Sequence, residues 1–574
     1  RPEAYICRVA PLGKGYGHSL RDTPCICTLQ ATQRAQGVTQ RFPTGNAVMK
    51  NNNSPQGLPQ RLFLAILLTA LGSYVLLAWI TSGPTHGWML DFIDGWRLFH
   101  IDDAYRFFLV RSAWSNPDLY HWSYVQPVAL VVDGLLAAVT GGDLLLMRIA
   151  HAIAGAATLL MLWRTAAHLD IRPATMLPAL LILAFMPVYA FGFLSFNAEN
   201  WLAFFLSLVM LAWASQRLTL AVLVCALLPL IRPEGIMPLA TLALYLLYQR
   251  HWRLLLLLLT PGMLYAAYLL WVLPRPEDYM NWRLAFRDIL NRASDDELRL
   301  AGRLFSTVNL LWLAPALLAP WHAGFRRLAP VTLGALIWLL CLTAMVFAHL
   351  TFFESRYLLS ILPVLTLAWA AGIQVLLSWL PTPERARTIL PLMLGVLLLG
   401  EHLIQFDPLK HRLGDRRYPI AGPPAVLPDF LPRLVQREAA ARELAAQLHQ
   451  MTHDEPRIRE ILVFNEDFFY ALDPVRLRPG VRVVYAPTSE AAADLLLDSG
   501  IYGIHPGMPK HNLYFFAEPH ANARHLAVYV GHLDRGWEPF FDQENLTAYL
   551  LEFSTRAPFT PGRLRELRYT AQHD

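Results

Sequence analysis

The stretch of sequence that decides the fold is LFLAILLTALGSYVLLAWIT, residues 62–81. It contains no charged residue, and an α-helix needs about 20 predominantly apolar residues to cross the hydrocarbon core of a bilayer. Over the whole chain of 574 residues, 55% are hydrophobic and only 16% are charged. A soluble protein of this length needs more charge to cover its surface, so the sequence predicts an integral membrane protein built from helical spans.

Similar apolar blocks recur along the chain, and the positive-inside rule orders them. A weaker block at 125–140 contains Asp133 and is long enough only for a short span or an interfacial helix. If it does not span, the basic loops all fall on the cytoplasmic side, which predicts about eleven spans with the N-terminus inside. The other predicted spans are 144–163, 174–193, 201–215, 218–231, 236–249, 252–273, 306–320, 329–350, 357–379 and 388–404.

The composition divides the chain into three parts. Residues 1–48 are polar and aperiodic, and we expect a disordered extension before a start at Met49. Residues 49–405 form the predicted transmembrane domain, with a first outward loop at 82–124. Residues 406–574 contain no spanning block, but they show strand patterns at 461–464, 481–485 and 500–504 and a helical pattern at 489–499. That order predicts a small extracytoplasmic α/β domain.

Four groups of charged residues at the ends of spans fall on the outer face in this threading. Ionisable groups near the hydrocarbon boundary are costly, and when they gather they line a water-filled cavity. Each group also has a structural explanation, namely helix capping for the Asp pair, a solvated loop, an interfacial ion pair, or an arginine that reaches the headgroups. The groups are Asp102-Asp103, 197–200 with Glu199, 231–235 with Arg232 and Glu234, and 353–357 with Glu354, Arg356 and Tyr357.

Such a cavity favours the displacement of a phosphate leaving group. A carboxylate such as Asp102 or Asp103 can take a proton from an acceptor hydroxyl or amine. Guanidinium groups can neutralise the departing phosphate through bidentate hydrogen bonds. The candidate arginines are Arg356, Arg232, Arg106 and Arg111, and the aromatic residues Trp114 and Tyr124 are expected to line the cavity with Glu199, Glu234, Glu354 and Tyr357.

The chain resembles the GT-C superfamily of polyprenyl-phosphate-sugar-dependent glycosyltransferases, in particular the bacterial protein mannosyltransferases and aminoarabinose transferases. The similarity covers roughly residues 62–405. Near its end, Arg356-Tyr357 precedes a Leu- and Pro-rich span. No Trp-Trp-Asp tripeptide of the oligosaccharyltransferase type is present. The similar N-terminal elements are Asp102-Asp103-Ala104-Tyr105, Arg111, Asn116, Pro127, Gly142 and Arg148-Ile149-Ala150-His151-Ala152.

The resemblance implies an enzyme of the bacterial inner membrane with the C-terminal domain in the periplasm. Asp102 or Asp103 would be the base, with Asp102 preferred, and Arg356 would hold the donor phosphate. Members of the superfamily differ in their use of a divalent cation, which leaves a role for Mg²⁺ or Mn²⁺ open. The donor would be a polyprenyl-phosphate-linked sugar, and the acceptor a protein, a lipid or a glycan.

Two other classes compete with a glycosyltransferase. A transporter or flippase for lipid-linked glycans would show internal repeats and broken helices at mid-membrane, and the sequence has no such repeat. An O-antigen ligase or polymerase would place its functional region in a large late outward loop, whereas here the first loop is the acidic, aromatic one. Nothing in the sequence indicates a nucleic-acid partner.

Overall fold

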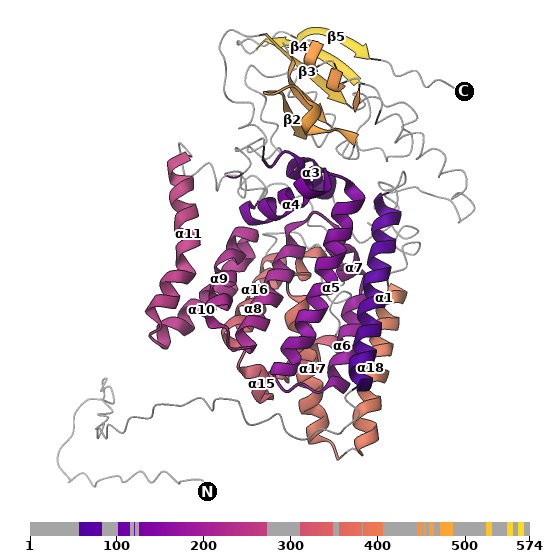
Figure 1. Ribbon diagram of the computed structural model, residues 1–574, viewed down its shortest axis with the longest axis vertical. Helices are drawn as coiled ribbons and strands as arrows, with labels where there is room; N and C mark the ends of the chain where they lie inside the picture. Colours follow the sequence, from indigo (N-terminus) through magenta and orange to yellow (C-terminus); the bar gives the residue numbers. More distant parts are fainter. Residues whose placement is uncertain are drawn as a thin grey trace, which may run out of the picture. The chain divides into compact units, whose positions relative to one another are not determined.

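A computed structural model shows a bundle of apolar helices and a separate set of β-strands (Figure 1). Residues 1–48, Tyr124, Glu354, the predicted helix at 489–499 and the predicted strand at 500–504 lie outside the described residues. The structure describes residues 57–82, 101–114, 120, 126–272, 310–347, 355–381, 383–405, 442, 445–446, 448–450, 452–454, 458–463, 471–485, 524–530, 548–554 and 561–567.

Among the described residues, four helices are long and apolar enough to cross a membrane: α1 (Gly57–Ser82), α5 (Leu144–His168), α11 (Trp252–Val272) and α17 (Leu362–Trp379). A fifth span results if the bent pair α6 (Pro173–Phe185) and α7 (Pro187–Leu194) is counted as one. The helical membrane architecture therefore agrees with the sequence, whereas the count of eleven spans stays a prediction.

The remaining helices do not meet the combined test of length and hydropathy over their described residues. Block 125–140 forms α4 (Pro127–Thr140), whose 14 residues are too few for an upright span. The other elements are α3 (Ile101–Arg111), α8 (Ala198–Ala214), α9 (Leu218–Ile231), η3 (Pro233–Gly235), α10 (Ile236–Tyr248), α14 (Leu310–Ala316), η4 (Ala319–Trp321), α15 (Ala323–Arg326), α16 (Ala329–Phe347), η5 (Ser355–Leu358) and α18 (Glu384–Gln405).

The block predicted as one span at 174–193 is instead two helices, α6 and α7, which meet at an angle of 56°. Pro187 opens α7, and a proline both removes an N–H donor and forces the residue before it out of the helical region. Met186 accordingly has the extended angles φ −65° and ψ 124°. After this bend, α7 ends at Leu194 and the turn 195–197 leads into α8. The polar residues of the site contact this turn.

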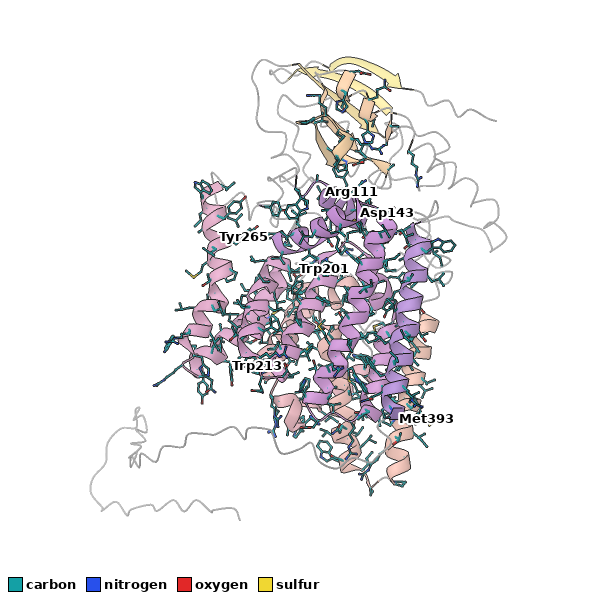
Figure 2. All side chains as sticks on the ribbon, viewed as in Figure 1. Arg111, Asp143, Trp201, Trp213, Tyr265 and Met393 are labelled. Carbon is teal, nitrogen blue, oxygen red and sulfur yellow. The ribbon has the colours of Figure 1, made fainter. Side chains whose placement is uncertain are left out.

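Two helix ends contact neighbouring loops. Gln374 near the end of α17 hydrogen-bonds both to the N–H of Arg172 and to the carbonyl of Asp170. Trp213 near the end of α8 donates to the carbonyl of Arg327 at 2.7 Å. Asp170, Arg172 and Arg327 belong to loops that the positive-inside rule assigned to one side. In Figure 2, Trp213 and Met393 lie toward one end of the bundle, and Arg111, Asp143 and Tyr265 lie toward the other.

The C-terminal strands β1 (Ile458–Val463), β2 (Arg482–Tyr485), β3 (Arg524–Val530), β4 (Ala548–Ser554) and β5 (Pro561–Leu567) form one sheet in the order β2-β1-β3-β4-β5. Strand β1 pairs in parallel with β2 and β3, and the last two pairings are antiparallel. The strands predicted at 461–464 and 481–485 coincide with β1 and β2. The α/β assignment of the whole of 406–574 stays a prediction, because the segments between the strands are not described.

Three helices end at a non-glycine residue with positive φ: Asp170 at 59°, Gln216 at 63° and Arg250 at 58°. In the last of them, the N–H of His251 reaches back to the carbonyl of Leu246 at 2.9 Å, as in a Schellman cap. A left-handed conformation costs an L-residue roughly 1–2 kcal/mol, whereas glycine adopts it freely.

We therefore expect Arg250→Gly to raise the free energy of unfolding by about 1 kcal/mol. The measurement is the midpoint of thermal unfolding in detergent, which should rise. The neighbouring Gln249 has helical angles (φ −79°, ψ −2°), so Gln249→Gly should lower the midpoint. Equal effects of the two substitutions would show that the left-handed conformation of Arg250 does not limit stability.

Candidate functional site

The centre of the site is the turn 195–197, which joins α7 to α8. Asp103, on the first turn of α3, is 1% exposed. Its Oδ1 accepts the backbone N–H of Phe196. Its Oδ2 lies 2.9 Å from the guanidinium of Arg148 on α5, and Arg148 also donates to the carbonyl of Thr81 at the end of α1. One buried ion pair thus ties three helices to the turn.

A second buried pair, His151 with Asp133, also contacts the turn 195–197. Nε2 of His151 lies 2.9 Å from Oδ1 of Asp133 on α4, and the indole N–H of Trp201 donates to the same oxygen at 2.8 Å. Nδ1 of His151 lies 2.9 Å from the carbonyl of Ser195 and 3.0 Å from Nδ2 of Asn200. A protonated Nδ1 donates to the Ser195 carbonyl and an unprotonated Nδ1 accepts from Asn200, so the tautomer decides which of these two contacts is a hydrogen bond.

The helix period explains why Arg148 and His151 act together. They lie three residues apart on α5, so they share one face of the helix. Both are fully buried, at 0% exposure. A charged group inside an apolar bundle requires a partner, because burying an unpaired ion costs far more than the pair does. Arg148 has that partner in Asp103, and the Asp133 carboxylate has its partners in His151 and in the indole of Trp201.

A third cluster, the Arg232 clamp, consists of Glu199, Arg232, Glu234 and Tyr357. One terminal nitrogen of Arg232 lies 2.6 Å from Glu199, which is in the first turn of α8. Nε and the other terminal nitrogen contact both oxygens of Glu234, at 2.9 and 2.6 Å. The guanidinium carbon stands 5.6 Å from the centre of the Tyr357 ring. Arg232 therefore holds two carboxylates at once.

These contacts link the four charged groups that the sequence placed on one face. Asp103 bonds the turn that leads to Glu199, Glu199 pairs with Arg232, and Arg232 lies over Tyr357. Described residues of the second, third and fourth groups are therefore in contact, whereas the water-filled cavity that they were expected to line stays a prediction. Figure 2 shows Trp201, whose indole joins this network, on the same side of Trp213 as Arg111 and Asp143.

Two of the predicted site residues make structural contacts instead. Arg111 was predicted to bind phosphate, but its guanidinium donates to the carbonyl of Leu472 at 2.6 Å and stacks on Phe107. Burial lowers the pKa of Arg111 to about 10, although the Asp473 carboxylate opposes that shift. Trp114 was predicted to line the cavity, but it donates to the carbonyl of Gly134 and keeps an exposed ring. Neither joins the clamp.

The placement of the other predicted residues is only partly defined. Arg106 lies on α3 and is half-buried. The backbone of Asp102 lies in the first turn of α3, and that of Arg356 lies in η5, but their side chains are outside the described residues. Within the described residues, no three His, Cys, Asp or Glu side chains come together as metal ligands. Glu199 and Glu234 are joined through the Arg232 cation.

The sequence interpretation missed Asp133, Arg148 and His151 as candidate site residues. Asp133 was treated only as a weakness of its apolar block, and Arg148 and His151 only as part of a resemblance. A usable signal was present, since an ionisable residue inside a span indicates a functional network with a partner elsewhere.

The pair between Asp103 and Arg148 can be tested by unfolding. Asp103→Asn should lower the free energy of unfolding by about 3–5 kcal/mol, because it leaves the buried Arg148 charge uncompensated. The double variant Asp103→Asn/Arg148→Gln should be less destabilised than Asp103→Asn alone. The control is Asp143→Asn at the exposed N-cap of α5, which should change stability little, since asparagine caps as well as aspartate. Strictly additive losses in the double variant would argue against the pair.

Comparison with models of known protein families found no match, and no curated protein matches the sequence of this chain.

Proposed function

We propose that the protein is an integral-membrane glycosyltransferase that moves a sugar from a polyprenyl-phosphate donor to an acceptor. The observation that carries the proposal is the contact chain from Asp103 through the turn 195–197 and Glu199 to Arg232 and Tyr357. It supplies carboxylates and a guanidinium at one end of an apolar bundle, which are the groups that a phosphate-displacing reaction uses.

The proposed reaction is a single inverting displacement. The acceptor oxygen or nitrogen attacks the anomeric carbon, and the bond from that carbon to the phosphate oxygen breaks with its electron pair. The phosphate leaves on the lipid as an anion, which Arg232 and Arg356 neutralise. The acceptor loses its proton to a carboxylate. The sugar is thereby transferred with inversion at the anomeric carbon.

Asp102 is the proposed base, and Asp103 is the residue that positions α3. Asp103 already uses one oxygen on Arg148 and the other on the N–H of Phe196. These two contacts hold Asp103 inside the bundle, and losing them would leave the buried arginine unpaired. Asp102 is adjacent on the same helix turn, so Asp103 fixes the backbone that carries it.

The proposed setting is the bacterial inner membrane. About eleven spans, a cytoplasmic N-terminus and an extracytoplasmic C-terminal domain follow from the distribution of basic loops. This orientation puts the clamp at the outer side, where lipid-linked sugars are presented together with their acceptors.

The proposal is tested by sugar release from a panel of polyprenyl-phosphate sugars in proteoliposomes. Asp102→Asn should lower kcat by 10²-fold or more and leave donor binding intact, since a general base contributes about 10²–10⁴-fold. Asp102→Glu, which retains a carboxylate, should recover part of the rate. Undiminished release by Asp102→Asn would refute the assignment of the base, and no release from any donor by the unmodified protein would refute the function.

A further inference from the structure

Arg232 is the cation of the clamp, and it is ion-paired with two carboxylates. Glu199 takes one terminal nitrogen at 2.6 Å, and Glu234 covers the edge formed by Nε and the other terminal nitrogen. A phosphate binds arginine through the same bidentate geometry as a carboxylate. A phosphate can therefore reach this bidentate edge of Arg232 only by replacing Glu234.

The two carboxylates differ in how readily they can leave. The side chain of Glu199 is 2% exposed, whereas those of Glu234 and Arg232 are 12% and 15% exposed. Releasing Glu199 would leave a charge in the interior of the bundle, which is costly. Releasing Glu234 returns a carboxylate to the accessible side of the clamp, where water can solvate it.

The backbone under Glu234 is fixed, so the exchange needs only a side-chain rotation. The N–H of Gly235 bonds to the carbonyl of Arg232 at 2.9 Å, which closes the turn η3. A Cβ added at Gly235 would lie 2.3 Å from the carbonyl carbon of Leu228, so the turn packs directly on the last turn of α9. Glu234 is thus presented to Arg232 by a rigid turn, while its own side chain remains the movable part.

We infer that Glu234 is a resident counter-ion that the donor phosphate displaces from Arg232, and that it thereby sets the affinity and selectivity of the site for phosphate. This inference rests on the proposed function and assigns Glu234 a specificity-determining role in it. Glu199 holds Arg232 throughout the exchange, which keeps the guanidinium oriented and always paired. An anion at low concentration in solution does not displace Glu234 from its bidentate contact. A phosphate on a prenyl chain is held in the membrane at high local concentration, and it can therefore compete with Glu234 for Arg232.

The test is equilibrium binding of farnesyl phosphate to the full-length protein in nanodiscs, with inorganic phosphate and farnesol as parallel probes. Glu234→Gln should lower the Kd for farnesyl phosphate about tenfold and should let inorganic phosphate bind. Glu199→Gln should change the Kd less than about twofold, because Glu234 still covers the bidentate edge. Farnesol, which has no phosphate, should bind the unmodified protein and both variants equally.

Two results for the glutamine variants would overturn the inference. Equal tightening in Glu199→Gln and Glu234→Gln would show that only the total charge matters, and an unchanged or raised Kd in Glu234→Gln would make the contact purely structural. Glu234→Asp keeps the charge on a shorter side chain and serves as a second variant. It should lower the Kd for farnesyl phosphate less than Glu234→Gln does. If the unmodified protein and all variants fail to bind farnesyl phosphate, the proposed donor itself is wrong. Normal binding with no effect of Glu234 contradicts the inference alone.

Discussion

The ion pair between Asp103 and Arg148 is the interaction on which the rest of the site depends. Both side chains are buried, and each is also bonded to backbone, Asp103 to Phe196 and Arg148 to Thr81. In an apolar bundle such a pair contributes little net stability, but breaking it is costly. It therefore acts as a constraint, since α1, α3, α5 and the turn 195–197 can pack only in the arrangement that keeps it intact.

From that constraint the site divides into two parts with different tasks. The pairs of Asp103 with Arg148 and of Asp133 with His151 are fully enclosed and hold the turn before α8. The Arg232 clamp includes Glu199 in the first turn of α8, and its Arg232 and Glu234 side chains are partly exposed. The enclosed pairs fix the backbone, and the clamp presents charges that can exchange partners. This division explains how a bundle of apolar helices can hold seven acidic and basic side chains close together.

The sequence predicted the helical membrane class and the gathering of Glu199, Arg232 and Tyr357, because the composition and the loop charges carry that information directly. It did not predict the break at Met186, although Pro187 was a visible signal for it. It also could not reveal which oxygen of Asp103 bonds to which partner, because those contacts depend on helix rotation. Arg111 shows the same limit, since a phosphate ligand and an arginine that binds the carbonyl of Leu472 look alike in sequence.

We expect the buried pair of Asp103 with Arg148 and the partly exposed Arg232 clamp to contribute jointly to catalysis. A double-mutant cycle on sugar release measures this coupling. The kcat/KM of Asp103→Glu, of Arg232→Lys and of the double variant would be measured with one polyprenyl-phosphate donor. Residues that act as a unit give non-additive effects. The account predicts that the double variant is about as active as the weaker single variant. Losses that multiply would contradict it, because Asp103 and Arg232 would then act independently.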